Sequence, residues 1–264
     1  MSAAFALGAT VATAQEAGLE AMIAAARPAQ VVILGEVHDN PGHHARQAEV
    51  LAAINPTAIV FEMITAQEAA RITPSLAGDA AALATALDWA NSGWPDFAYY
   101  APLFAFGTDV PIYGAGIGRD RARAAFADGA ASVFGDEAAR FGLTAALPET
   151  EQTTREGEQM AAHCDALPVD ILPGFVEAQR LRDAALAQAA LAALADHGAP
   201  VAVITGNGHA RRDWGVPAVL ARAAPQTLVF SLGQFEAPPE GDVPFDLWSV
   251  SEPVDRPDPC AAFR

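Results

Sequence analysis

The sequence is short of positive charge. Lys and Arg together number 15 against 32 Asp and Glu among 264 residues, so the formal net charge is −17 at pH 7. A surface of this sign repels the phosphate backbones of nucleic acids and anionic lipid headgroups. We therefore expect no nucleic-acid partner. Charged residues make up only 18% of the chain and hydrophobic residues 52%, which excludes intrinsic disorder for its bulk.

Long apolar runs and several catalytic motifs are also missing. Charges, Gly or Pro interrupt every hydrophobic segment before the roughly 18 to 20 residues that a membrane span needs. The chain has no G-x-S-x-G elbow, P-loop, Rossmann fingerprint or C-x-x-C pair. These absences argue against serine hydrolases, NTPases, dinucleotide enzymes and thiol redox proteins.

Cysteine is nearly absent, with Cys164 and Cys260 as its two examples. If the protein is exported, the even count allows one disulfide, which would tie the proline-rich tail to the body. Two buried free thiols are the alternative. The residue counts leave both possibilities open.

The N-terminus is small, apolar and uncharged from Ala3 to Ala14 and ends in an Ala-x-Ala pattern. This pattern predicts that residues 1–14 are the remnant of a signal peptide that is cleaved after Ala14, although a basic n-region is missing. An ordinary Ala-rich helix is the alternative. We expect a periplasmic or cell-envelope protein with a single domain over residues 15–264. No cysteine near the N-terminus offers a lipid anchor, so membrane association would need an anchor upstream of this sequence.

Short apolar runs that alternate with helical patterns predict an α/β fold, in which helices flank a mainly parallel central sheet on both faces. Asn40-Pro41 is typical of a helix start, because Asn caps and Pro suits the first helical position. A long helix is expected over 174–196, and a helical insertion around 129–172. Strands are expected over 31–34, 58–61, 110–113, 201–204 and 227–232, with a sixth, at an edge, over 245–250.

Three of the six histidines fall within seven residues, directly after the first predicted strand. Glu36 and His38 follow the strand, and His43 and His44 open the next helix. Ligands in parallel α/β folds bind beyond the carboxyl ends of the strands. Imidazole and carboxylate groups at that edge can bind a divalent metal or haem iron, or transfer protons.

Two further strand ends carry polar residues. Glu62 follows the second strand and is expected to face the same edge, or else to cap the next turn or pair with an arginine. Gly206-Asn207-Gly208-His209 follows the fourth strand and repeats the Gly-x-x-His outline of residues 35–38. The nearby Arg211 and Arg212 are suited to carboxylates, including haem propionates, or to a structural pair with Asp213 or Glu62.

An aromatic stretch between Trp94 and Phe106 contains Tyr99 and Tyr100. Such clusters are often core, but a flat apolar wall with phenols also suits a porphyrin.

With these residues the chain resembles ChaN-like proteins of the haem-binding uptake family, in the superfamily that includes Tiki-type metalloproteases. The resemblance runs from about residue 29 to the C-terminus and implies an EreA/ChaN-like fold and an exported haem-binding protein linked to iron. The matching segments are Leu34 to His38 with His43-His44, Glu62, Gly93-Trp94-Pro95, Tyr100-x-Pro102, Gln179 to Asp183, Gly206 to His209 with Arg211, Gly215-Val216-Pro217 and Asp258-Pro259-Cys260.

Two hypotheses follow. As a binding protein, the chain would hold haem for uptake or storage, with a Tyr or His on the iron and with a homodimer as a possible assembly. The expected haem-binding residues are His38, His43, His44, Tyr99, Tyr100, Asn207, His209 and Arg211. As a metal-dependent hydrolase, it would hold a divalent metal ion and a water through Glu36, His38, Glu62 and His209. The aromatic stretch needs an explanation only under the first hypothesis, which we therefore favour.

Overall fold

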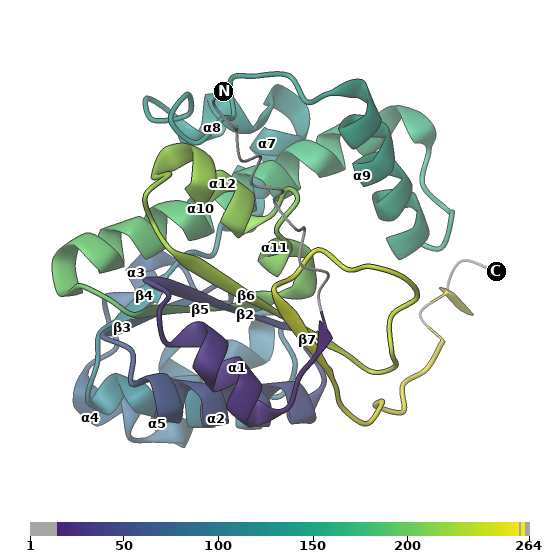
Figure 1. Ribbon diagram of the computed structural model, residues 1–264. Helices are drawn as coiled ribbons and strands as arrows, with labels where there is room; N and C mark the ends of the chain where they lie inside the picture. Colours follow the sequence, from purple (N-terminus) through teal and green to yellow (C-terminus); the bar gives the residue numbers. More distant parts are fainter. Residues whose placement is uncertain (1–14, 259, 262–264) are drawn as a thin grey trace, which may run out of the picture.

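The computed structural model describes residues 15–258 and 260–261. Its core is a seven-stranded sheet in the order β1-β7-β6-β2-β5-β3-β4, and every neighbouring pair is parallel (Figure 1). The strands are β1 (Gln15–Glu16), β2 (Val31–Glu36), β3 (Ala58–Phe61), β4 (Ile112–Gly114), β5 (Val201–Gly206), β6 (Val229–Phe235) and β7 (Leu247–Val250). The predicted α/β fold with a parallel sheet is confirmed. The predicted signal-peptide remnant, residues 1–14, lies outside the described residues.

Helices cover both faces of the sheet because the central strands are apolar on both sides. In β2, Val32 and Leu34 face one core, while Val31 and Ile33 face the other, and all four are fully buried. The first core is covered by α1 (Leu19–Ala26), α2 (Pro41–Ile54), α3 (Ala66–Ala69), α4 (Pro74–Ala77), α5 (Ala80–Ala86), η1 (Trp89–Asn91), α6 (Phe97–Phe104) and η2 (Ala105–Thr108). The second is covered by α7 (Arg119–Asp128), α8 (Ala130–Phe134), α10 (Leu172–His197), α11 (Asn207–Ala210) and α12 (Val216–Ala223).

Local capping chemistry explains where α2 begins. The Asn40 side chain accepts hydrogen bonds from the backbone N–H groups of Gly42 and His43, and Pro41 occupies the first turn. The helix ends at Asn55, which adopts a left-handed conformation with φ of 48°. The predicted start at Asn40-Pro41 is confirmed.

Residues 129–172 contain α8, α9 (Glu149–Ala162) and η3 (Val169–Ile171). Helix α9 lies beside α10 on the second face of the sheet, toward the side where the strands end (Figure 1). No described helix has the length and apolarity required to cross a membrane.

Two predictions about strands are wrong. Residues 247–250 form β7, which is not at an edge, because the two-residue β1 pairs with its outer side. The strand expected over 110–113 begins only at Ile112, and Pro111 remains outside it. A two-residue strand carries too little periodicity to be found in a sequence, so the partner of β7 could not be foreseen.

Candidate functional site at the carboxyl edge of the sheet

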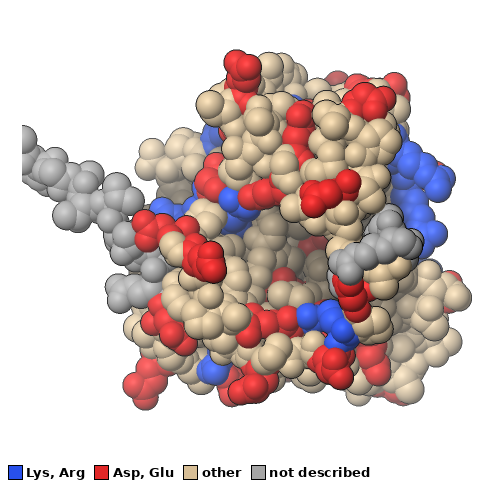
Figure 2. All heavy atoms as spheres, turned by 90° about the vertical axis from the view of Figure 1, so that its right-hand side faces the viewer, with Lys and Arg blue, Asp and Glu red and all other residues tan. Residues whose placement is uncertain are grey.

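A cavity of about 400 Å³ lies beyond the carboxyl ends of β2 and β5, beneath α9. Figure 2 views the side toward which these strands end and shows a hollow among uncharged side chains, with more acidic than basic groups around it. The cavity is lined by Glu36, Val37, His38, Arg155, Glu158, Gln159, Val176, Gln179, Asp183, Gly206, Asn207, Gly208, His209 and Trp214. Both Gly-x-x-His segments therefore reach one cavity, as the strand-end argument predicts.

Glu36, the last residue of β2, is a buried carboxylate that three side chains hold in place. Its Oε1 accepts hydrogen bonds from the Tyr100 hydroxyl and from His38 Nδ1, both at 2.8 Å. Its Oε2 accepts one from the Gln47 amide at 2.8 Å. Glu36 therefore orients His38, whose side chain is 34% exposed.

His209 has the same kind of support from a different element. Its Nδ1 lies 2.7 Å from Asp183 Oδ1 on α10, and its Nε2 faces Glu62 Oε1 at 3.6 Å. Glu62 Oε2 accepts hydrogen bonds from the Thr205 hydroxyl at 2.6 Å and from the Gly206 N–H at 2.9 Å. The His38 ring lies where a side chain on Gly206 would stand, with Nε2 2.8 Å from an ideal Cβ position. A side chain at position 206 would therefore displace the His38 ring.

Burial and nearby charges shift the pKa values of Glu62, His209 and His38. Burial opposes ionisation of Glu62, but the charges of His209 and His38 and two hydrogen bonds outweigh it and lower its pKa to about 2. Burial lowers the pKa of His209, but Glu62 and Asp183 outweigh it and raise the pKa above the ordinary value. Burial also lowers the pKa of His38, but the hydrogen bond to Glu36 and the charge of Glu62 outweigh it and raise the pKa above the ordinary value. The edge thus pairs an ionised carboxylate with two readily protonated imidazoles.

We predict that Glu62→Gln lowers the free energy of unfolding at pH 7 by about 2 to 3 kcal/mol and has little effect near pH 2. The pKa of Glu62 is depressed, so its contribution is present above about 4.5 and is lost as the pH falls toward 2. Urea unfolding of both proteins between pH 2 and 7 measures this. The exposed Glu49→Gln is the control, and a constant difference between Glu62→Gln and the wild type across this range would contradict the prediction.

Comparison with known proteins identifies the family. The model described as "Haem-binding uptake, Tiki superfamily, ChaN" matches residues 22–220. The chain belongs to this family. Among solved structures it is similar to "Cofacial heme binding to ChaN of Campylobacter jejuni", with 18% identity, a TM-score of 0.66, and coverage of 86% of this chain and 90% of that one. It is also similar to "The structure of the type III effector HopBA1", with 12% identity, a TM-score of 0.49, and coverage of 94% and 100%. No curated protein matches the sequence.

Several residues that the sequence suggested as haem ligands of a ChaN-family protein have structural partners instead. His43 Nδ1 accepts the Val37 N–H at 2.9 Å, and its Nε2 donates to the Phe235 carbonyl at 3.2 Å. His44 Nε2 donates to the His38 carbonyl at 2.8 Å, and its ring is buried behind the edge. Asn207 exchanges two hydrogen bonds with the backbone of Gln234.

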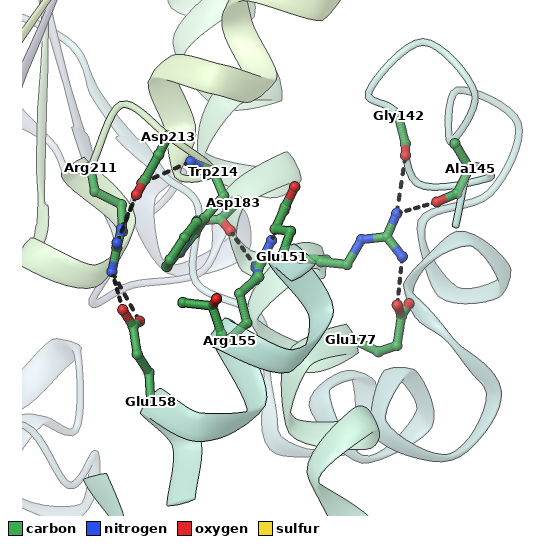
Figure 3. A network of polar contacts seen from close by, with 12 residues as sticks. Gly142, Ala145, Glu151, Arg155, Glu158, Glu177, Asp183, Arg211, Asp213 and Trp214 are labelled. Carbon is green, nitrogen blue, oxygen red and sulfur yellow. Dashed lines mark hydrogen bonds and ion pairs between the residues drawn. The ribbon is translucent and has the colours of Figure 1, made fainter. Parts of the chain in front are cut away.

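Arg211 is likewise engaged. Its guanidinium pairs with Asp213 and Glu158 and lies 3.5 Å from the ring centroid of Trp214 (Figure 3). Arg212 pairs with Asp246 at 2.6 Å. The expected pairing of one arginine with Asp213 is present, whereas no arginine pairs with Glu62 in the described part of the chain. Neither guanidinium is free for a haem propionate in this arrangement.

In two of the three tyrosines of this chain, the hydroxyl already donates a hydrogen bond to a carboxylate. Tyr100 is fully buried, and burial together with Glu36 raises the pKa of its phenol well above the ordinary value, which disfavours a phenolate ligand. Tyr113 donates to Asp196 at 2.8 Å, and burial with this bond raises its pKa to about 12. Tyr99 is half-buried, stacks on His44, and has no hydroxyl partner among the described residues.

Tyr100→Phe is expected to lower the free energy of unfolding by about 1.5 to 3 kcal/mol, because it removes a donor from a buried carboxylate. The matched control, Tyr113→Phe, loses an exposed hydrogen bond and should cost less than about 1 kcal/mol. Thermal unfolding measures both. If Tyr113→Phe lost more stability than Tyr100→Phe, the buried hydrogen bond from Tyr100 to Glu36 would not be the more important of the two.

Asp183 and Gln47 are positioning residues that the sequence analysis did not assign to the site, although Asp183 ends one of the segments that carry the family resemblance. Asp183 lies on the buried face of α10 together with Arg180, and charged residues on a mainly apolar helix face are the signal that could have revealed it. Within residues 15–258 and 260–261 no three His, Cys, Asp or Glu side chains are grouped as a metal site. The metal-dependent hydrolase alternative is therefore not favoured.

Proposed function

We propose that this ChaN-family protein binds haem. The observation that carries the proposal is the family match over residues 22–220, which includes the carboxyl ends of β2, β3, β4 and β5 and all of α10. The similar Campylobacter jejuni structure is described as a cofacial haem complex. The aromatic residues Trp94 and Trp214 beside the edge cavity are consistent with a flat apolar ligand.

Haemin titration of the purified full chain tests the proposal. We expect a saturable Soret band at a fixed number of haems per chain. Protoporphyrin IX without iron is the control and should bind more weakly, because it lacks the iron–protein bond. Haemin uptake that does not saturate, or that equals uptake by an unrelated acidic protein, would overturn the proposal.

We further propose that the protein is exported and serves iron or haem uptake or storage. Cys164 and Cys260 form a disulfide, and such bonds persist in oxidising compartments. The Ala-x-Ala pattern before Gln15 is consistent with this. Fractionation of the source cells with an antibody tests export, and a cytoplasmic protein with two alkylatable thiols would contradict it.

We propose a homodimer as the haem-loaded assembly, since cofacial haems need two binding faces opposite one another. Light scattering before and after haemin addition measures the mass. A mass that stays that of one chain at full loading would exclude this assembly.

A further inference from the structure

A second cavity, of about 340 Å³, lies between α7, the end of α9 and the first turns of α10. It adjoins the edge cavity, because Gln159 and Gln179 line both. Its walls are Ala122, Arg123, Phe126, Gln159, His163, Phe175, Ala178, Gln179 and Arg182. This composition of two rings, one imidazole and two guanidinium groups differs from the acidic edge and suits an amphipathic anion.

His163 presents a ligating nitrogen to this cavity. Its Nδ1 lies 2.7 Å from the Gln159 carbonyl oxygen. A carbonyl can only accept, so the proton is on Nδ1, and Nε2 keeps its lone pair. Nε2 has no partner among the described residues. This tautomer, held by a backbone carbonyl, is the one that an imidazole needs to ligate iron.

Four of the other five histidines do not offer a comparable atom. His43 and His44 hydrogen-bond to the backbone, and His38 and His209 hydrogen-bond to carboxylates that raise their pKa values. The fifth, His197, donates from Nε2 to the Tyr113 hydroxyl at 3.0 Å. The Tyr113 hydroxyl already donates its proton to Asp196, so it can only accept a hydrogen bond from His197. His38 Nε2 also has no hydrogen-bond partner among the described residues, but His38 lines the acidic edge cavity, whereas His163 lines a cavity with arginines and phenylalanines.

Two phenylalanines form an apolar wall next to His163. Phe175 lies 4.9 Å from the His163 ring, and Phe126 lies 5.2 Å from Phe175 in an edge-to-face arrangement. Phe126 is 37% exposed, which makes it one of three large exposed hydrophobic residues in the described chain. An exposed ring at the mouth of a cavity provides the surface that a macrocycle would cover.

The cavity also contains arginines without strong partners. Arg182 is half-buried, and its guanidinium has no hydrogen bond or ion pair among the described residues. Arg123 meets only Asp120, at 3.7 Å, and both side chains are largely exposed. By contrast, Arg155, Arg180 and Arg211 are each paired with carboxylates. Weakly paired guanidinium groups in a chain of net charge −17 provide local attraction for propionates.

We propose that haem binds in this cavity, with His163 Nε2 on the iron, Phe126 and Phe175 against the macrocycle, and Arg123 and Arg182 on the propionates. This inference rests on the proposed haem-binding function and assigns its site. It replaces the ligands expected from the Gly-x-x-His segments. Tyr99, the one tyrosine with an unpartnered hydroxyl in the described chain, is the rival ligand, and it does not line this cavity.

The test compares haemin binding by the full chain and by His163→Asn. An Asn amide can replace Nδ1–H toward the Gln159 carbonyl, but it lacks Nε2, so the local fold is kept while the ligand is lost. We expect a displaced Soret band and affinity lower by roughly tenfold or more, with the band restored by added imidazole. His197→Asn, an exposed histidine at the end of α10, is the matched control and should bind as the wild type does.

A second comparison examines the propionates. Arg123→Gln with Arg182→Gln should weaken haemin binding by about tenfold without displacing the Soret band, because charge-assisted pairs are lost while the iron ligand remains. Arg71→Gln, an exposed arginine on the other face of the sheet, controls for net charge. Equal weakening by Arg71→Gln would show nonspecific attraction and would overturn the propionate assignment.

The outcomes separate this inference from the proposed function. An unchanged spectrum and affinity in His163→Asn, together with a displaced band in Tyr99→Phe or His38→Ala, would overturn the His163 site and leave haem binding in place. A wild-type chain that takes up no haem would overturn both. Urea unfolding of each variant confirms that binding is compared between folded proteins.

Discussion

Asp183→Ala is expected to lower the free energy of unfolding by about 3 to 5 kcal/mol, because it removes the buried carboxylate shared by Arg155 and His209 and leaves Arg155 only the more exposed Glu151. Asp183 is 2% exposed and lies 3.5 Å from Arg155, which is itself 6% exposed (Figure 3). Its other oxygen holds His209 at 2.7 Å. Urea unfolding measures the loss.

Glu158→Ala is the matched control for this prediction. Glu158 also forms an ion pair with an arginine, Arg211, but its side chain is 46% exposed. Water replaces such a partner at small cost, so the expected loss is about 1 kcal/mol or less. Equal losses of stability in the two variants would contradict the prediction, because they would show that burial does not make the Asp183 ion pair more stabilising than the exposed one.

Loss of the disulfide is the second large effect that we expect. Cys164 and Cys260 are 96 residues apart, and a loop of that length predicts that the bond stabilises the fold by about 4 to 5 kcal/mol through the unfolded state. The variant that replaces both residues with Ser should lose this amount in denaturant unfolding. Dithiothreitol should lower the stability of the wild type equally and leave the variant unchanged.

The C-terminal tail keeps its ion pairs in the variant that lacks the disulfide. Arg256 pairs with Asp39 at 2.8 Å and with Glu236 at 2.6 Å, so the segment before the disulfide stays attached to the loops after β2 and β6. These pairs are partly exposed and contribute little each. Wild-type stability that does not respond to reductant would show that the tail already constrains the chain without the bond.

The sequence was enough to predict which residues lie at the carboxyl edge of the sheet, but not the role of the aromatic stretch. Glu36, His38 and His209 do line one cavity, because each follows an apolar run and parallel strands end on the same side. The aromatic stretch, in contrast, became part of the core. Tyr100 points inward from α6 and donates to Glu36, which is 64 residues away in the chain. No local pattern reports such a pairing.

The sequence by itself determined the elements and their common edge, since periodicity, caps and short apolar runs act over a few residues. The tertiary structure decided which donor atoms remain free. His43 and His163 are both histidines near helix ends, yet the nitrogens of His43 are occupied by Val37 and Phe235, whereas the Nε2 of His163 faces a cavity. That difference depends on contacts between distant segments, and only the packing of the sheet and its helices creates them.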